Sequence, residues 1–192
     1  MQIIKERYES KLEVKKSQFL SFLCPFEQTQ ALLKEVKKEH PKAVHFVYAY
    51  RFFDEAGRCV EDKSDDNEPK GTAGMPMLNV LRAYELINTS IIVVRYFGGI
   101  KLGTGGLMRA YTSAATAVIN LATLYEQKNI LILSMPLQFL GKMEHFLKKN
   151  SLEFKRKFQM HKVFLEINVN KKEMNEVIMF CENSFPYEIQ SL

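Results

Sequence analysis

The chain has 192 residues, 46% of them hydrophobic, which is typical of a globular protein with one domain or two small ones. Its three cysteines, Cys24, Cys59 and Cys181, lie far apart without zinc-type spacing, which excludes a disulfide scaffold and predicts reduced thiols. No apolar run approaches the roughly 18 residues of a membrane span, and the first residues lack a signal-peptide core, so we expect a cytoplasmic protein without a membrane partner. The net charge is +5, and nine Lys or Arg oppose three Glu between Lys142 and Lys172. This basic segment is compatible with nucleic-acid binding or with a solvated surface that aids solubility.

The first part of the chain predicts strands around one helix. Alternating apolar residues predict two strands over residues 3–24. Apolar residues at helical spacing predict a helix over residues 27–39, which Pro41 ends. Residues 43–53 are rich in β-branched and aromatic residues, and the turn at residues 54–57 predicts a hairpin with the strand that follows.

An acidic stretch and a short glycine motif come next. Residues 61–68 carry five carboxylates opposed by one lysine. Carboxylates at this density are suited to a hard divalent cation, but the EF-hand pattern is absent and such loops are usually solvated, so we predict no metal site. The motif at residues 71–74 leads into a helix with Pro76 near its start, where the missing N–H costs nothing. We expect the buried side of that helix to carry Leu78, Leu81, Tyr84 and Leu86.

The highest density of glycine lies between residues 95 and 111. The β-branched run at residues 90–94 predicts a buried strand before it, and apolar residues at helical spacing, from Leu107 to Leu121 and Ala122, predict a helix after it. A glycine-rich loop at a helix start directs backbone N–H groups into one concavity. The pattern therefore predicts an anion site, most simply for phosphate, although its spacing matches neither the P-loop nor the dinucleotide fingerprint, and tight packing alone is the alternative. The residues expected there are the cations Arg95, Lys101 and Arg109 and the glycines Gly98, Gly99, Gly103, Gly105 and Gly106.

The same stretch resembles the signature of the IMPACT family, whose bacterial branch is the YigZ group. The matching string is Arg95-Tyr96-Phe97-Gly98-Gly99-Ile100-Lys101-Leu102-Gly103-x-Gly105-Gly106-Leu107-x-Arg109-Ala110-Tyr111. A second match is Glu68-Pro69-x-Gly71-Thr72-Ala73-Gly74-x-Pro76, and shorter matches are Ser17-Gln18-Phe19 and His45 followed by Ala49-Tyr50. The chain has Asn67 where the family commonly has Gly, and Lys70 where it commonly has Ser.

The resemblance implies two domains. The N-terminal one would be similar to the second domain of ribosomal protein S5 and to the fourth domain of elongation factor G, and the C-terminal one would be ferredoxin-like. The polar residues 126–129 predict a domain boundary, and the order of elements after them predicts the second fold independently, because it reads β-α-β-β-α-β. The predicted strands cover residues 130–136, 152–159, 161–169 and 187–192, and the predicted helices cover residues 137–150 and 171–183. We therefore predict an α+β protein with domains at residues 1–126 and 130–192.

The resemblance also implies a function, because eukaryotic members of the family act in translational control. We predict a non-enzymatic protein that binds RNA or the ribosome, is linked to regulation of translation, has a protein partner there and carries no cofactor. Lys70, Gly71 and Thr72 would add donors to the phosphate site, His45 and Glu68 would support it, and Glu68 would pair with Arg95 or Arg109. The alternatives are an enzyme acting on a phosphorylated metabolite through His45, Glu68 or the acidic stretch, and a pure protein-interaction module.

Overall fold

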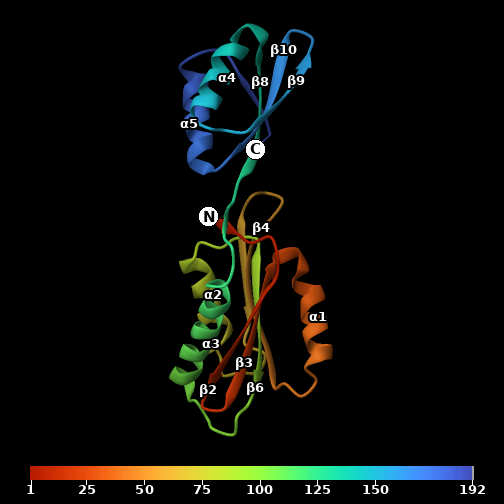
Figure 1. The fold of residues 1–192 in the computed structure, drawn as a ribbon, viewed down its shortest axis with the longest axis vertical. Helices are drawn as coiled ribbons and strands as arrows, with labels where there is room; N and C mark the ends of the chain where they lie inside the picture. Colours follow the sequence, from red (N-terminus) through yellow and green to blue (C-terminus); the bar gives the residue numbers. More distant parts are fainter. Residues whose placement is uncertain (192) are drawn as a thin grey trace. The chain divides into compact units, whose positions relative to one another are not determined.

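The computed structural model describes residues 1–191, which form two compact units, Met1–Glu126 (unit 1) and Gln127–Leu192 (unit 2) (Figure 1). Each unit combines helices with an antiparallel sheet, so the predicted α+β class is confirmed. Leu192, the last residue of the predicted strand over residues 187–192, lies outside the described residues.

Unit 1 contains a five-stranded antiparallel sheet with the order β2-β3-β6-β4-β5. Its strands are β2 (Tyr8–Val14), β3 (Ser17–Pro25), β4 (His45–Phe53), β5 (Cys59–Ser64) and β6 (Thr89–Tyr96). The central strand β6 is buried from Thr89 to Arg95 because helices cover both of its faces. A short ladder of β1 (Gln2–Ile3) and β7 (Tyr125–Glu126) closes the unit near its two ends.

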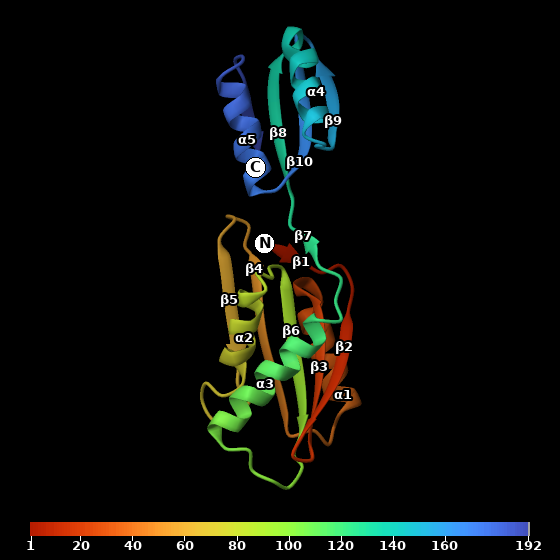
Figure 2. The same ribbon diagram turned by 60° about the vertical axis from the view of Figure 1, so that its left-hand side comes forward.

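Helices lie on both sides of this sheet. The helix α1 (Thr29–Glu39), which follows the short helix η1 (Phe26–Gln28), covers one face, and α2 (Gly74–Ala83) and α3 (Thr104–Ile119) cover the other (Figures 1 and 2). Successive side chains of a strand point to opposite faces, which gives each layer its own core. Residues Ile91 and Val93 of β6 pack with α2 and α3, whereas Ile92 and Val94 pack with α1.

Four residues lie beyond the ends of the helices predicted to carry them, Tyr84 and Leu86 after α2 and Leu121 and Ala122 after α3. Helix α2 ends at Ala83, so Leu86 is buried after the helix, where its N–H donates to the Leu81 carbonyl (2.9 Å). Helix α3 ends at Ile119, and Leu121 is 61% exposed in the turn that follows. The prediction that Leu121 belongs to the buried helical face was therefore wrong.

Unit 2 has the predicted β-α-β-β-α-β order. It consists of β8 (Asn129–Pro136), η2 (Leu137–Phe139), α4 (Leu140–Lys149), β9 (Phe154–Gln159), β10 (Lys162–Val169), α5 (Lys171–Glu182) and β11 (Glu188–Ser191). The sheet order β11-β8-β10-β9, with every pair antiparallel, is that of a ferredoxin-like fold. Both helices pack on one face of the sheet, through a core that includes Leu133, Leu147, Leu165 and Val177.

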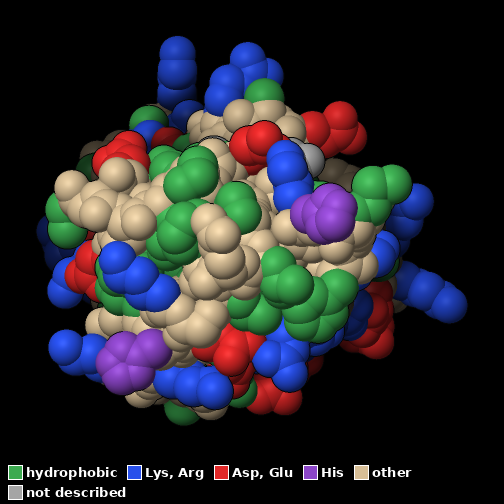
Figure 3. Space-filling model, turned by 90° about the horizontal axis from the view of Figure 1, so that it is seen from above, with side chains coloured by type: hydrophobic (Ala, Val, Ile, Leu, Met, Phe, Trp, Pro, Cys, Tyr) green, Lys and Arg blue, Asp and Glu red, His purple; other side chains and the backbone are tan. Residues whose placement is uncertain are grey.

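The surface of unit 2 mixes apolar and cationic side chains. Figure 3 shows hydrophobic side chains near the middle of one face, with Lys and Arg side chains mainly around them. The exposed apolar residues of this unit include Leu137, Phe158 and Met160. Among the helices of the described residues, none is long and apolar enough to cross a membrane.

The cysteines are free thiols in two kinds of environment. Cys59 is exposed at the start of β5, whereas Cys24 and Cys181 are buried in different cores. Burial raises the pKa of the Cys24 thiol to about 12 and that of the Cys181 thiol to about 11. Both buried thiols therefore stay protonated at neutral pH.

Candidate anion-binding site

Both glycine motifs lie at the same end of the unit 1 sheet. The β6–α3 loop (residues 97–103) leaves β6 directly after the position where Arg95 pairs with His45, near the start of β4. The β5–α2 loop (residues 65–73) leaves β5 at this end as well, because β5 is antiparallel to β4 (Figure 2). The sequence alone does not establish this convergence.

A buried polar network joins the two motifs. The side chain of Glu68 in the β5–α2 loop is 3% exposed, and its Oε1 accepts hydrogen bonds from Arg95 Nη1 (2.5 Å) and Tyr111 Oη (2.8 Å). His45 Nε2 lies 3.8 Å from the same oxygen. Burial beside this carboxylate raises the pKa of Tyr111 far above its usual value, so the phenol remains a donor. The expected pairing of Glu68 with Arg95 is confirmed.

The network corrects the expectation that Arg95 contacts phosphate. Arg95 is 5% exposed, its charge is compensated by Glu68, and its guanidinium lies 5.5 Å from the centroid of the Phe19 ring and 5.8 Å from that of Phe97. Its Nη1 is engaged by Glu68, and its Nε is buried without a hydrogen-bond partner, so little of the guanidinium reaches solvent. Arg95 therefore holds the two motifs together instead of binding a ligand.

His45 is oriented by the β5–α2 loop. Its Nδ1 lies 2.7 Å from the Asp66 carbonyl oxygen, which fixes Nδ1 as the protonated nitrogen and turns Nε2 toward Glu68. The Phe46 N–H donates to Asp66 Oδ2 at 2.6 Å. His45 and Glu68 thus hold the β5–α2 loop in place, and the contacts that they make are structural.

The start of α2 is already occupied by a carboxylate. Asp65 accepts hydrogen bonds from the N–H groups of Gly71 (2.7 Å), Ala73 (3.1 Å) and Gly74 (2.8 Å), and Thr72 Oγ1 donates to the Pro69 carbonyl (2.6 Å). Burial raises the pKa of Asp65, but the three N–H donors together outweigh it and leave the pKa below its usual range. The expectation that Gly71 and Thr72 donate to a phosphate is thus corrected, and of this group only the exposed Lys70 is available.

The start of α3 is open. Gly103, with φ of +71°, turns the chain into the helix, and the hydrogen-bond ladder begins with Leu107 N–H donating to the Gly103 carbonyl (2.9 Å). In the described part of the chain, no side chain caps this helix and its first turn contains no acidic residue. The N–H groups of Thr104, Gly105 and Gly106 therefore lie without a side-chain cap at the positive end of a 16-residue helix dipole.

Two of the predicted cations flank this open helix start. A Cβ built on Gly105 would lie 3.5 Å from Arg109 Nη1, so the guanidinium lies along the first turn of α3. Lys101 is exposed in the β6–α3 loop, as are Gly99 and Gly103. Backbone donors and side-chain cations thus share one surface.

Two further cations near this loop were not predicted from the sequence. The turn between β2 and β3 contains Lys15 and Lys16, both exposed and with positive φ. A Cβ on Gly98 would lie 2.1 Å from the carbonyl carbon of Lys16, and Gly98 N–H donates to Ser17 Oγ (3.1 Å). Only Gly fits here, and the contact brings the lysine turn against the β6–α3 loop. The signal in the sequence was a pair of lysines between two predicted strands.

The acidic stretch is held by protein partners. Glu61 accepts hydrogen bonds from Arg82 and Arg51, and these bonds lower its pKa. Asp62 lies near two tyrosine hydroxyls, and the other three carboxylates have the partners described above. Within residues 1–191, no group of three or more His, Cys, Asp or Glu side chains is arranged to hold a metal ion.

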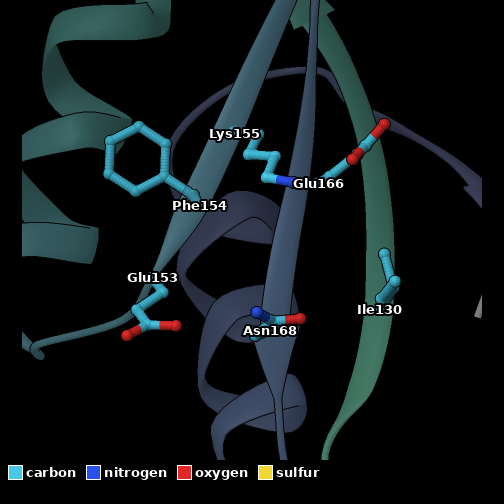
Figure 4. A pocket seen from close by; sticks show the side chains of 6 residues that line it. All are labelled: Ile130, Glu153, Phe154, Lys155, Glu166 and Asn168. Atoms are coloured by element: carbon cyan, nitrogen blue, oxygen red, sulfur yellow. The ribbon is translucent and has the colours of Figure 1, made fainter.

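Unit 2 has a small cavity of its own, of about 160 Å³ (Figure 4). It is lined by Ile130, Glu153, Phe154, Lys155, Glu166 and Asn168. In Figure 4, Lys155 extends toward Glu166, while Phe154 points toward the helix side of the sheet. Two carboxylates against one lysine make this cavity unfavourable for a phosphate.

The fold defines a two-unit α+β protein with a glycine-rich loop before α3, and comparison with known proteins gives its family. The Impact N-terminal domain matches residues 15–119. The IMPACT family member YvyE of Bacillus subtilis is 36% identical over 177 residues, covering 90% of this chain and 81% of its own. YigZ of Escherichia coli is 42% identical over 106 residues, covering 52% of this chain and 50% of its own. A crystal structure described as that of a hypothetical protein is 27% identical and covers 100% of this chain and 96% of its own, with a TM-score of 0.62. The chain belongs to the IMPACT family.

Proposed function

We propose that the protein binds RNA or the ribosome without catalysing a reaction, that it acts in the regulation of translation, and that RNA phosphates bind at the start of α3. The observation that carries the proposal is the contrast between the two helix starts. Asp65 accepts from the N–H groups of Gly71, Ala73 and Gly74 at the start of α2, whereas no side chain of the described residues caps the start of α3, beside Arg109 and Lys101. A helix N-terminus with uncapped N–H groups and cations around it suits a phosphate oxygen.

The positions of the exposed cations favour a ligand with several phosphates over a ligand with one. Exposed cations come from three separate segments, represented by Lys16 in the β2–β3 turn, Lys101 in the β6–α3 loop and Arg109 on α3. Lys70 adds a fourth segment at the same end of the sheet. Cations spread in this way follow a sugar-phosphate backbone and steer its approach.

Unit 2 would extend this footprint only in part. Between residues 127 and 192 there are ten Lys or Arg and seven Glu, which leaves a net charge of +3. Five of the cations are paired with a glutamate, most closely Arg156 with Glu144 (2.5 Å) and Lys162 with Glu188 (2.9 Å). We therefore assign the main phosphate contacts to unit 1.

The link to translation rests on kinship with the IMPACT family, whose eukaryotic members act in translational control by binding a protein partner. A protein partner in translation is compatible with the proposal, because ribonucleoproteins offer both RNA and protein surfaces. An enzymatic role for His45 and Glu68 is less well supported, since Glu68 is engaged by Arg95 and Tyr111.

Fluorescence anisotropy of labelled single-stranded and structured RNA tests the proposal. We expect binding by the wild type, and loss of most of it in the variant Lys101→Ala/Arg109→Ala. The matched control is Lys11→Ala/Lys34→Ala, which removes the same charge from exposed positions on β2 and α1. Equal weakening by both variants would indicate nonspecific attraction, and wild-type protein that binds neither RNA would refute the proposal.

A further inference from the structure

An uncharged groove runs between α2 and α3 on the outer side of unit 1. Its volume is about 400 Å³. Uncharged residues from both helices and from the β5–α2 loop line it, namely Gly71, Met75, Pro76, Asn79, Val80, Ala83, Tyr84, Met108, Thr112 and Thr116. In a chain where a quarter of the residues are charged, a groove with this lining indicates an apolar or planar ligand.

The groove begins beside the proposed phosphate site. Gly71 and Met108 line the end where both helices start, and Met108 precedes Arg109 in the sequence. Tyr84 Oη donates to Asn120 Oδ1 (2.8 Å), which joins the far ends of the two helices. The helices are therefore parallel, as Figure 2 shows, and the groove leads away from the cationic end of the unit.

We infer that the groove receives one unstacked base of a single-stranded RNA whose phosphate is bound at the start of α3. This inference rests on the proposed function and deepens it. An anionic backbone with uncharged, planar bases matches a cationic loop that adjoins an uncharged groove. Met75, Pro76 and Met108 offer apolar walls for the faces of a base, and Asn79, Thr112 and Thr116 offer polar groups for its edge.

The size of the groove favours a base over a helix of a protein partner. From Met75 to Ala83, α2 rises by about 12 Å, the length of roughly two helical turns. A stable protein interface buries on the order of 1,200 Å² or more, which exceeds what a groove of this length offers. One base with its ribose matches its scale.

Methyl NMR of protein labelled at its methionines tests the inference directly. The probes are a uridylate hexamer and a hexamer of the same ribose-phosphate backbone without bases. We expect the uridylate hexamer to shift the Met75 and Met108 methyl signals, while Met160 and Met179 in unit 2, 94% and 59% exposed, stay in place. The base-free hexamer should bind without these shifts, about 5- to 150-fold more weakly, the range for one stacked base.

A pair of variants separates the groove from the phosphate site. Ala83→Leu/Thr112→Leu fills the groove at two exposed positions and leaves the charge unchanged. It should bind both hexamers with the affinity that the wild type has for the base-free one. The control Ser113→Leu, exposed on α3 outside the groove lining, should keep the preference for bases.

The outcomes distinguish the inference from the proposed function. If both hexamers bind equally and the Met75 and Met108 signals do not move, the inference fails, the proposed function stands and the groove is left to a protein segment. If neither hexamer binds, both fail. Shifts of these signals with rising protein concentration and no RNA would assign the groove to a second copy of the chain and overturn the inference.

Discussion

Replacing Glu68 by Ala should destabilise unit 1 severely. The carboxylate is 3% exposed and compensates the guanidinium of Arg95, which is 6% exposed at its side chain. Its removal leaves a buried cation without a counterion, which costs about 3–5 kcal/mol. The Tyr111 hydroxyl loses its acceptor at the same time. We therefore expect the free energy of unfolding of unit 1 to fall by at least about 3 kcal/mol.

Tyrosine fluorescence during urea unfolding measures this loss. The chain lacks Trp, and seven of its eight tyrosines lie between residues 1 and 126, so the signal follows unit 1. The double variant Glu68→Leu/Arg95→Met replaces the pair by apolar side chains of similar size and should cost less than the sum of the single changes. A loss below about 1 kcal/mol for Glu68→Ala, or full additivity in the double variant, would refute the reasoning.

Three further predictions concern the loops and the thiols. Asp65→Ala should lower the free energy of unfolding by about 0.5–2 kcal/mol at neutral pH. Because the pKa of Asp65 is lowered in the folded state, this difference in stability from the wild type should shrink as the pH falls below 3.8, as measured by urea unfolding at a series of pH values. A difference that does not change with pH would contradict this. Gly98→Ala should lower the urea midpoint by the equivalent of about 1–3 kcal/mol through its clash with Lys16, whereas Gly105→Ala, whose Cβ has room, should raise it by up to about 1 kcal/mol. A thiol reagent at neutral pH should modify one cysteine of the native protein rapidly, and Cys59→Ser should abolish that phase.

The local elements of the glycine motif were predictable because their signals lie close together in the sequence. A β-branched run, a cluster of glycines and apolar residues at helical spacing gave β6, the loop and α3. The order of elements in unit 2 was predictable for the same reason. The end of α3 was not, since Leu121 continues the apolar pattern beyond the last residue that the core can bury.

The alternation of residues along β6 indicates that Arg95 is buried, although its charge favours an exposed position. Residues Ile91, Val93 and Arg95 alternate along β6, so all three point to the face that α2 and α3 cover. What the sequence could not give was how tightly Glu68, 27 positions earlier, would neutralise the guanidinium. The local sequence of a basic residue next to glycines is the same whether its side chain is buried or exposed to solvent.

Contacts between distant segments set the remaining features of the site. Asp65 reaches the N–H groups of α2 from six to nine residues earlier in the chain, beyond the spacing of a capping box. The approach of Lys16 to Gly98 depends on the pairing of β3 with β6, which are separated in the chain by η1, α1, β4, β5 and α2. Sheet order decides such contacts, and a single sequence does not reveal it.

The salt dependence of RNA affinity tests the central claim most directly. Each phosphate neutralised on a single strand contributes about −0.7 to the slope of log K against log salt. We expect a negative slope for the wild type, and a slope less steep by about 1.4 for Lys101→Ala/Arg109→Ala, which removes two contacts. An identical slope and affinity in the variant, or wild-type binding that does not respond to salt, would contradict a phosphate site at the start of α3.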